Sequence, residues 1–147
     1  MKLLIQRVNA AHVIVDQKTV GKIQKGLCVF VGIAEKDTLA VLEKMAEKLV
    51  QLRIFEDAAG KMNLSLSDVR GQALLISQFT LLADCSKGRR PAFTAAGDPV
   101  VAKELYHDFC KMVASKGIEV QTGIFAADML VHIENDGPCT FWIDSEK

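Results

Sequence analysis

A continuous apolar run, Leu27-Cys28-Val29-Phe30-Val31-Gly32-Ile33, follows Gly26 in this chain of 147 residues. A strand with one face in water alternates apolar and polar side chains, whereas a strand that is covered on both faces is apolar throughout. The run therefore predicts a central strand with other elements packed against both of its faces.

Segments with strand-like patterns lie on either side of this run. Leu3, Ile5, Val13 and Val15 alternate with more polar neighbours, which is the period of a half-buried strand. The remaining strands that we expect lie at residues 3–15 with a break near Asn9-Ala10, 19–23, 53–55, 72–82, 118–121, 129–134 and 139–143.

Two segments have helical periodicity instead. Asp37-Thr38 opens the first, in which apolar residues recur at helical spacing as far as Val50 and charged residues fill the opposite side. Pro99 suits the first position of the second helix. Gly117 suits the left-handed position that ends it.

Strands therefore outnumber helices, and the two helices are well separated in the sequence. This pattern predicts an α+β fold: a mostly antiparallel, curved sheet or open β-barrel with two main helices packed on it. The chain has the length of one ordinary domain and shows no repeat or linker, so we expect residues 1–147 to form a single domain.

The amino-acid composition limits the classes of function that the chain can have. Half of the residues are hydrophobic, and 18 Lys and Arg balance 18 Asp and Glu. A neutral chain is not expected to bind polyanions generally, so any nucleic-acid contact must be local. Charge interrupts the apolar stretches before ~18 residues, so no membrane span is expected. The four cysteines are far apart, which disfavours a zinc site, and reduced thiols without an export signal predict the cytoplasm.

Three polar side chains stand at the end of an apolar strand, in Ser77-Gln78-Phe79-Thr80. They could simply form the polar face of that strand. Alternatively, they belong to a ligand site, because hydroxyls and backbone amides at strand ends commonly build one. The long polar loop that follows, Asp84 to Asp98, contains Lys87-Gly88-Arg89-Arg90-Pro91. This basic segment is either a solvated loop or a phosphate contact.

Gly137-Pro138 lies between two strand-like segments, within Asn135-Asp136-Gly137-Pro138-Cys139. Taken alone, the pair predicts a hairpin turn. An X-Pro bond is also the one common place for a cis peptide, and a rigid pair would present its carbonyl groups. The three histidines show no spacing that specifically favours a Ser-His-Asp triad.

Taken together, these segments resemble the D-aminoacyl-tRNA deacylase family over nearly the whole chain. The matching blocks, in order, are 5–8, 61–63, 77–81, 87–91, 122–125, 127–129 and 135–138. Cys139 stands where the family commonly has valine, and Ala92 stands where serine is common. Both departures are small, although Ala92 changes the hydrogen bonding that is available to its loop.

The resemblance implies an enzyme that hydrolyses the ester of D-aminoacyl-tRNA, and of glycyl-tRNA mischarged on tRNA-Ala, without metal or other cofactor. It implies a homodimer in which Gly137 and Pro138, as a Gly-cisPro motif, enter the active site of the other subunit. Main-chain groups would then leave no room for an L side chain, whereas glycine would pass. Arg7 matches the residue that orients this motif.

By the same resemblance, Thr80 is the candidate nucleophile, and Ser77, Gln78 and Phe79 line the pocket. No base is evident near Thr80 in the sequence. We therefore favour an oxyanion site made by the backbone N–H groups of Phe79 and Thr80, with the 2′-hydroxyl of the terminal adenosine helping to activate water. Phe125 and Met129 match pocket-wall positions, or else simply pack in the core.

Two other functions fit the sequence. One is a related editing deacylase that acts on L-alanyl-tRNA, which would need Gly137-Pro138 to be trans. The other is a non-enzymatic protein that binds an RNA end or associates with DNA, which would bind without hydrolysis.

Overall fold

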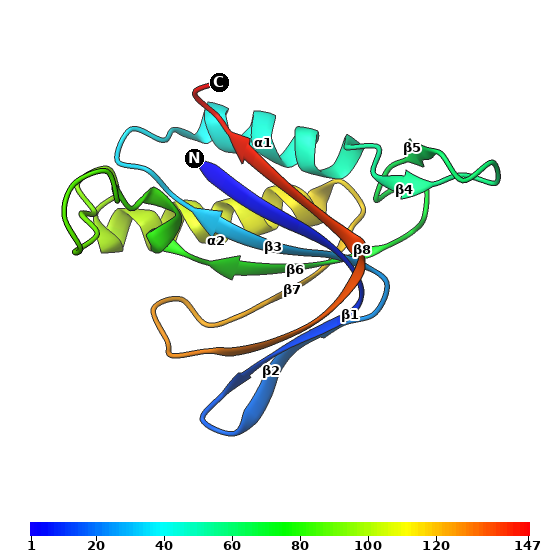
Figure 1. Cartoon of the computed structure of the whole chain (residues 1–147), viewed down its shortest axis with the longest axis horizontal. Coiled ribbons are helices and arrows are strands. Elements are labelled where there is room, and N and C mark those ends of the chain that lie inside the picture. Colours follow the sequence, from blue (N-terminus) through cyan, green and yellow to red (C-terminus); the bar gives the residue numbers. More distant parts are fainter.

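The computed structural model describes residues 1–147 and contains one large sheet, one small sheet and two helices (Figure 1). The elements, in chain order, are β1 (Lys2–Val15), β2 (Lys18–Ile23), β3 (Gly26–Gly32), α1 (Leu39–Gln51), β4 (Phe55–Glu56), β5 (Met62–Leu64), β6 (Gln72–Ser77), the 3-10 helix Phe79–Leu82, α2 (Pro99–Ser115), β7 (Glu119–Thr122) and β8 (Leu130–Asp144).

The large sheet has the strand order β2-β1-β3-β6-β7, and β8 pairs with the other edge of β1. The pairs of β1 with β2, β3 and β8 are antiparallel, whereas β3–β6 and β6–β7 are parallel. Parallel neighbours need a crossover connection, and α1 and α2 supply the two crossovers. The predicted α+β fold with a mostly antiparallel, curved sheet and two helices is confirmed.

Both helices lie on the same side of the central strands, and the far ends of β1, β2 and β8 curve away from them (Figure 1). One hydrophobic core fills the space between sheet and helices and includes Leu27, Val29 and Val31. A second core lies inside the curved part of the sheet and includes Cys28 and Leu74. The apolar run is therefore buried on both faces, as its sequence predicts.

The helix ends follow their sequence signals. The Thr38 hydroxyl accepts a hydrogen bond from the N–H of Val41 at the start of α1. The Asp98 carboxylate accepts one from the N–H of Val100 at 2.9 Å, and Pro99 is the first residue of α2. Gly117 has a φ of +83°, the left-handed conformation expected of it.

Two strand predictions were wrong. The strand expected at 72–82 ends at Ser77, and Phe79–Leu82 forms a 3-10 helix. The two strands expected at 129–134 and 139–143 form one strand, β8, which pairs with β1 along both of its halves. The pairing changes register in the middle of β1, where the break near Asn9-Ala10 was expected.

The α-amino group of Met1 is buried beside α1. It lies 2.6 Å from Oδ1 of Asp37, as an ion pair, and donates to the Ser145 hydroxyl at 2.7 Å. The second oxygen of Asp37 accepts the N–H of Ala34 at 2.7 Å. This cluster ties the start of β1 to the connection between β3 and α1. Neither helix of the structure has the length and apolar character needed to cross a membrane.

Candidate active site

A cavity of about 730 Å³ lies at the edge of the sheet where the parallel strands β3 and β6 end. Ligands of open parallel sheets commonly bind outside the carboxyl ends of the strands, because the chain leaves the sheet there and exposes backbone groups. Three segments complete the wall: the loop before α2, the first turn of α2, and the connection between β7 and β8.

The end of β6 supplies the polar wall of the cavity. Ser77 and Gln78 line it, and the N–H of Gln78 donates to the carbonyl of Val31 at 2.8 Å. Phe79 then starts the 3-10 helix, and the first N–H groups of a helix have no acceptor within it. The N–H groups of Phe79 and Thr80 have no backbone acceptor within the chain, and Phe79 lines the cavity, so the start of the 3-10 helix offers free backbone donors beside it.

Thr80 is exposed beside this wall and does not itself line the cavity. Its hydroxyl accepts a hydrogen bond from the Gln78 amide at 2.5 Å, and no carboxylate or imidazole bonds to it. None of the three histidines of the chain lines the cavity. The environment of Thr80 thus lacks the base that a nucleophilic hydroxyl requires.

The apolar wall comes from aromatic and sulfur side chains. Phe79 and Phe93 pack with ring centroids 5.0 Å apart, and Phe125 and Met129 also line the cavity. The family resemblance offered Phe125 and Met129 as pocket-wall positions, with core packing as the alternative, and sequence reasoning missed Phe93. The signal for Phe93 was weak, because it stands alone in a polar loop.

Tyr106 is a second residue that sequence reasoning missed. It lies on α2, is buried, and donates its hydroxyl to the carbonyl of Leu75 at 2.8 Å. The N–H of Gly123 donates to the same carbonyl at 3.2 Å, and the Tyr106 and Phe125 rings lie 5.8 Å apart. Burial raises the pKa of Tyr106, so its hydroxyl stays protonated as a donor. The ring therefore joins α2, β6 and the β7–β8 connection behind the cavity.

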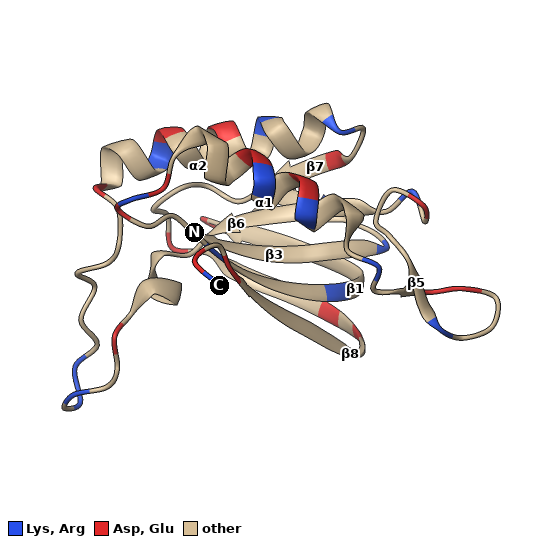
Figure 2. Cartoon of the chain, turned by 90° about the horizontal axis from the view of Figure 1, so that it is seen from above, with Lys and Arg blue, Asp and Glu red and all other residues tan.

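The charged groups that line the cavity are acidic, and the loop that contributes Phe93 to its wall also carries basic groups. Asp98 and Asp128 line the cavity, but Asp98 is already engaged in capping α2. Figure 2 shows Lys and Arg residues at the tip of a loop that projects from the molecule. This loop leads from the 3-10 helix to α2 and carries Lys87, Arg89 and Arg90.

Gly137 and Pro138 form a separate cluster in the middle of β8. Their peptide bond is cis, and both residues are exposed. They do not form a hairpin turn, as their sequence alone suggested. Instead, the four residues Asp136–Cys139 stand opposite the single residue Arg7, between the pairs Gln6–Thr140 and Val8–Asn135. The segment is thus a bulge in a continuous strand.

Arg7 holds the base of this bulge. Its guanidinium is almost fully buried and donates from Nη1 to the carbonyl of Ile54 at 2.7 Å. Its Nε lies 3.0 Å from Oδ2 of Asp136, an ion pair that is not aligned as a hydrogen bond. A Cβ atom on Gly137 would lie 3.3 Å from Nη2 of Arg7, so the two residues are in close contact.

The bulge and the cavity do not meet within one chain. The row of paired residues that starts at Ser77 runs through Val31 and Leu3 to Ile143 of β8. The bulge lies opposite Arg7, four residues farther along β1. The bulge and the end of β6 are three strand spacings apart across the sheet and four residues apart along the strands. These offsets correspond to a distance of about 20 Å. One chain alone therefore brings together Ser77, Gln78, Phe79, Phe125 and Met129, with Thr80 adjacent, and leaves Arg7, Gly137 and Pro138 elsewhere.

Comparison with known proteins identifies the family. The family model described as D-Tyr-tRNA(Tyr) deacylase matches residues 4–144. The chain is 52% identical to a D-aminoacyl-tRNA deacylase of Fervidobacterium nodosum and 51% identical to one of Thermotoga petrophila, in each case over 100% of this chain and 99% of the relative. The chain belongs to the D-aminoacyl-tRNA deacylase family. The family consists of hydrolases, so the chain is an enzyme of that class.

Solved structures agree with this fold. A protein described as c-Myc DNA Unwinding Element Binding Protein matches with a TM-score of 0.93 and 37% identity, over 98% of both chains. A probable eukaryotic D-amino acid tRNA deacylase matches with a TM-score of 0.82 and 20% identity, over 97% of this chain and 98% of the other, which shows a shared fold. In the deacylase described here, no three His, Cys, Asp or Glu side chains gather in an arrangement that suits a metal ion.

Proposed function

We propose that this protein hydrolyses the ester bond of D-aminoacyl-tRNA, and of glycyl-tRNA mischarged on tRNA-Ala, to free amino acid and tRNA. The proposal rests on one observation: about half of the residues of this chain are identical to those of relatives named D-aminoacyl-tRNA deacylase, along their whole length. The cavity supports it, because its apolar wall suits an adenosine ring and the free backbone N–H of Phe79 beside it suits an ester carbonyl.

In the mechanism that we propose, the cavity positions the ester and stabilises its transition state. Water attacks the ester carbonyl, and the negative charge that develops on the carbonyl oxygen is bound by the N–H groups of Phe79 and Thr80. The 2′-hydroxyl of the terminal adenosine takes the proton from water and passes it to the leaving 3′-oxygen. The absence of a base beside Thr80 favours this scheme over direct attack by its hydroxyl.

Substrate chirality is set, in this proposal, by Gly137 and Pro138 from the second subunit of a homodimer. Their main-chain groups would hold the α-amino group of the substrate and occupy the space into which an L side chain points. The separation of about 20 Å within one chain supports an arrangement across subunits, because the bulge cannot reach its own cavity. The exposure of both residues supports it as well.

Deacylation of matched D- and L-tyrosyl-tRNA by the purified protein tests the activity. We expect rapid release of D-tyrosine and stable L-tyrosyl-tRNA. Release from the L-form alone, or from L-alanyl-tRNA but not from the D-form, would identify an editing deacylase for L-amino acids. Binding of RNA or DNA without any hydrolysis would favour a binding function like the one for which the DNA-unwinding-element neighbour is named.

Replacement of Thr80 by alanine separates the two mechanisms. The Thr80→Ala variant keeps the backbone N–H groups and loses only the hydroxyl that Gln78 contacts. We expect turnover to fall only moderately, because the hydroxyl is not the attacking group. Complete loss of turnover with retained fold and tRNA binding would instead make Thr80 the nucleophile.

Mixed dimers test the contribution of the second subunit. Gly137→Ala would damage the bulge, since Gly137 has a φ of +121° and its added Cβ would lie 3.1 Å from the Cys139 nitrogen. The double variant Gln78→Ala/Phe79→Ala would damage the cavity wall. Each homodimer should be inactive, whereas random pairing of the two should restore about a quarter of all sites, because half of the dimers contain one complete site. A mixture that stays inactive after subunit exchange would refute the arrangement.

A further inference from the structure

The projecting loop has a closed and strongly basic tip, Cys85–Pro91. Asp84 and Ala92 close its base by exchanging two backbone hydrogen bonds, at 2.7 and 2.9 Å. Between them the tip carries Lys87, Arg89 and Arg90, all of them exposed. Backbone hydrogen bonds thus fix the base of the tip, whereas the basic side chains of the tip are exposed and can contact another molecule.

The three cations of the tip have no partner within the chain. None of them takes part in the ion pairs of the structure. The nearby carboxylate of Asp84 accepts the N–H of Ser86 at 2.9 Å, and the hydrogen bonds from Ser86 hold the pKa of that carboxyl below its usual range. In a chain with no net charge, three unpaired cations in one short segment form a local positive site.

The same loop continues directly into the cavity. Phe93 stands three residues after Arg90 and packs against Phe79 in the cavity wall. Three residues span at most about 10 Å, so the Cα atom of Arg90 lies within about 10 Å of the Cα atom of Phe93 in the cavity wall. The loop is also fixed to the body beyond Phe93, because the N–H of Gly97 donates to the carbonyl of Ile33 at 3.1 Å.

We propose that the basic tip binds the backbone phosphates of the 3′-terminal single strand of tRNA while the ester occupies the cavity. This inference rests on the proposed function. A 3′-terminal adenosine in the cavity is preceded along its strand by phosphates, which must pass over the rim. Arginine binds phosphate oxygens through two parallel N–H groups, and lysine binds them as a point charge. The tip therefore supplies affinity for RNA to a chain that has no excess of positive charge.

A triple variant, Lys87→Ala/Arg89→Ala/Arg90→Ala, tests this site with two substrates. The first is D-tyrosyl-tRNA, and the second is adenosine esterified with D-tyrosine, which has no phosphate. On tRNA, KM should rise about tenfold or more at low salt, while kcat is kept. A plot of log kcat/KM against log salt should become less steep by about 2, because each single-strand phosphate that the protein neutralises accounts for ~0.7 of the slope. The adenosine ester should be hydrolysed as by the wild type.

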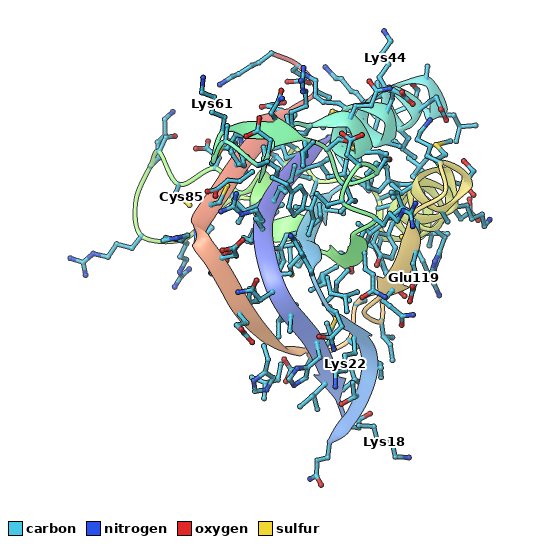
Figure 3. All side chains as sticks on the ribbon, turned by 90° about the vertical axis from the view of Figure 1, so that its right-hand side faces the viewer. Lys18, Lys22, Lys44, Lys61, Cys85 and Glu119 are labelled. Carbon is cyan, nitrogen blue, oxygen red and sulfur yellow. The ribbon has the colours of Figure 1, made fainter.

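The matched control is Lys18→Ala/Lys22→Ala/Lys44→Ala, which removes the same charge elsewhere. Figure 3 shows Lys18 and Lys22 at the lower end of the molecule and Lys44 at the top, whereas Cys85 marks the projecting loop. The control should keep the wild-type KM and salt slope. An equal loss in both variants, an unchanged salt slope in the tip variant, or a loss on the adenosine ester would overturn the inference.

Failure of the inference is distinguishable from failure of the proposed function. If the wild type hydrolyses D-tyrosyl-tRNA and the tip variant matches it, only the inference fails. If the wild type hydrolyses neither D-substrate, the proposed function fails. Binding of uncharged tRNA, measured with both triple variants, then decides whether the tip binds RNA: weaker binding by the tip variant alone supports the site, and equal binding refutes it.

Discussion

Replacing the buried Arg7 by methionine should destabilise the protein by about 2–4 kcal/mol. Methionine retains much of the volume of the side chain but removes the charged donor. The hydrogen bond from Nη1 to the Ile54 carbonyl is buried, and losing a bond from a charged donor costs about 1.5–3 kcal/mol. The ion pair with Asp136 adds about 0.5–1 kcal/mol, because the carboxylate is 38% exposed and its approach is not aligned.

Equilibrium unfolding in urea, at one fixed subunit concentration, measures this loss. The concentration must be fixed because association of folded subunits would add to the apparent stability. Arg53→Met is the matched control. Arg53 also donates two hydrogen bonds, both to Asn63, but it is exposed, so this variant should lose less than about 1 kcal/mol. Equal losses in the two variants would refute the reasoning that burial makes the Arg7 contacts strong.

Three further predictions concern groups outside the polar wall of the cavity. Tyr106→Phe removes the hydroxyl that bonds Leu75, so it should cost about 1 kcal/mol in a urea titration and raise KM more than it lowers kcat. Asp37→Asn leaves the buried α-amino group of Met1 without its counter-ion, and thermal or urea unfolding should show a loss of about 3–5 kcal/mol. Of the four thiols, only exposed Cys85 should react quickly with a disulfide reagent at neutral pH, because the other three are buried and burial raises the pKa of the Cys28 thiol to about 12.

The sequence predicted those elements whose local pattern and tertiary environment agree. The apolar run at Leu27–Ile33 and the helix starts at Thr38 and Pro99 are examples. The sequence did not predict the elements whose extent depends on pairing between segments that are distant in the chain. Nothing local in 129–143 indicates that both halves pair with the same partner, and β1 alone determines that they form one strand.

The candidate site divides in the same way. Ser77 and Gln78 could be offered as site residues, beside the alternative of a plain polar face, because they stand at the end of their own strand, and both line the cavity. Tyr106 could not, since its role depends on the carbonyl of Leu75, which is distant in sequence. A lone tyrosine on the buried face of a helix was the available signal, because a buried hydroxyl needs an acceptor.

The bulge in β8 also affects how the folded protein behaves toward other sheets. β8 is 15 residues long and is paired only with β1, so its outer edge is open. A long open edge can add strands from other molecules and so promote aggregation, and bulges are one of the devices that prevent it. Asp136–Cys139 interrupts the edge near its middle, and Pro138 has no N–H to offer. The segment proposed to select substrates thus also protects the deacylase against uncontrolled sheet growth.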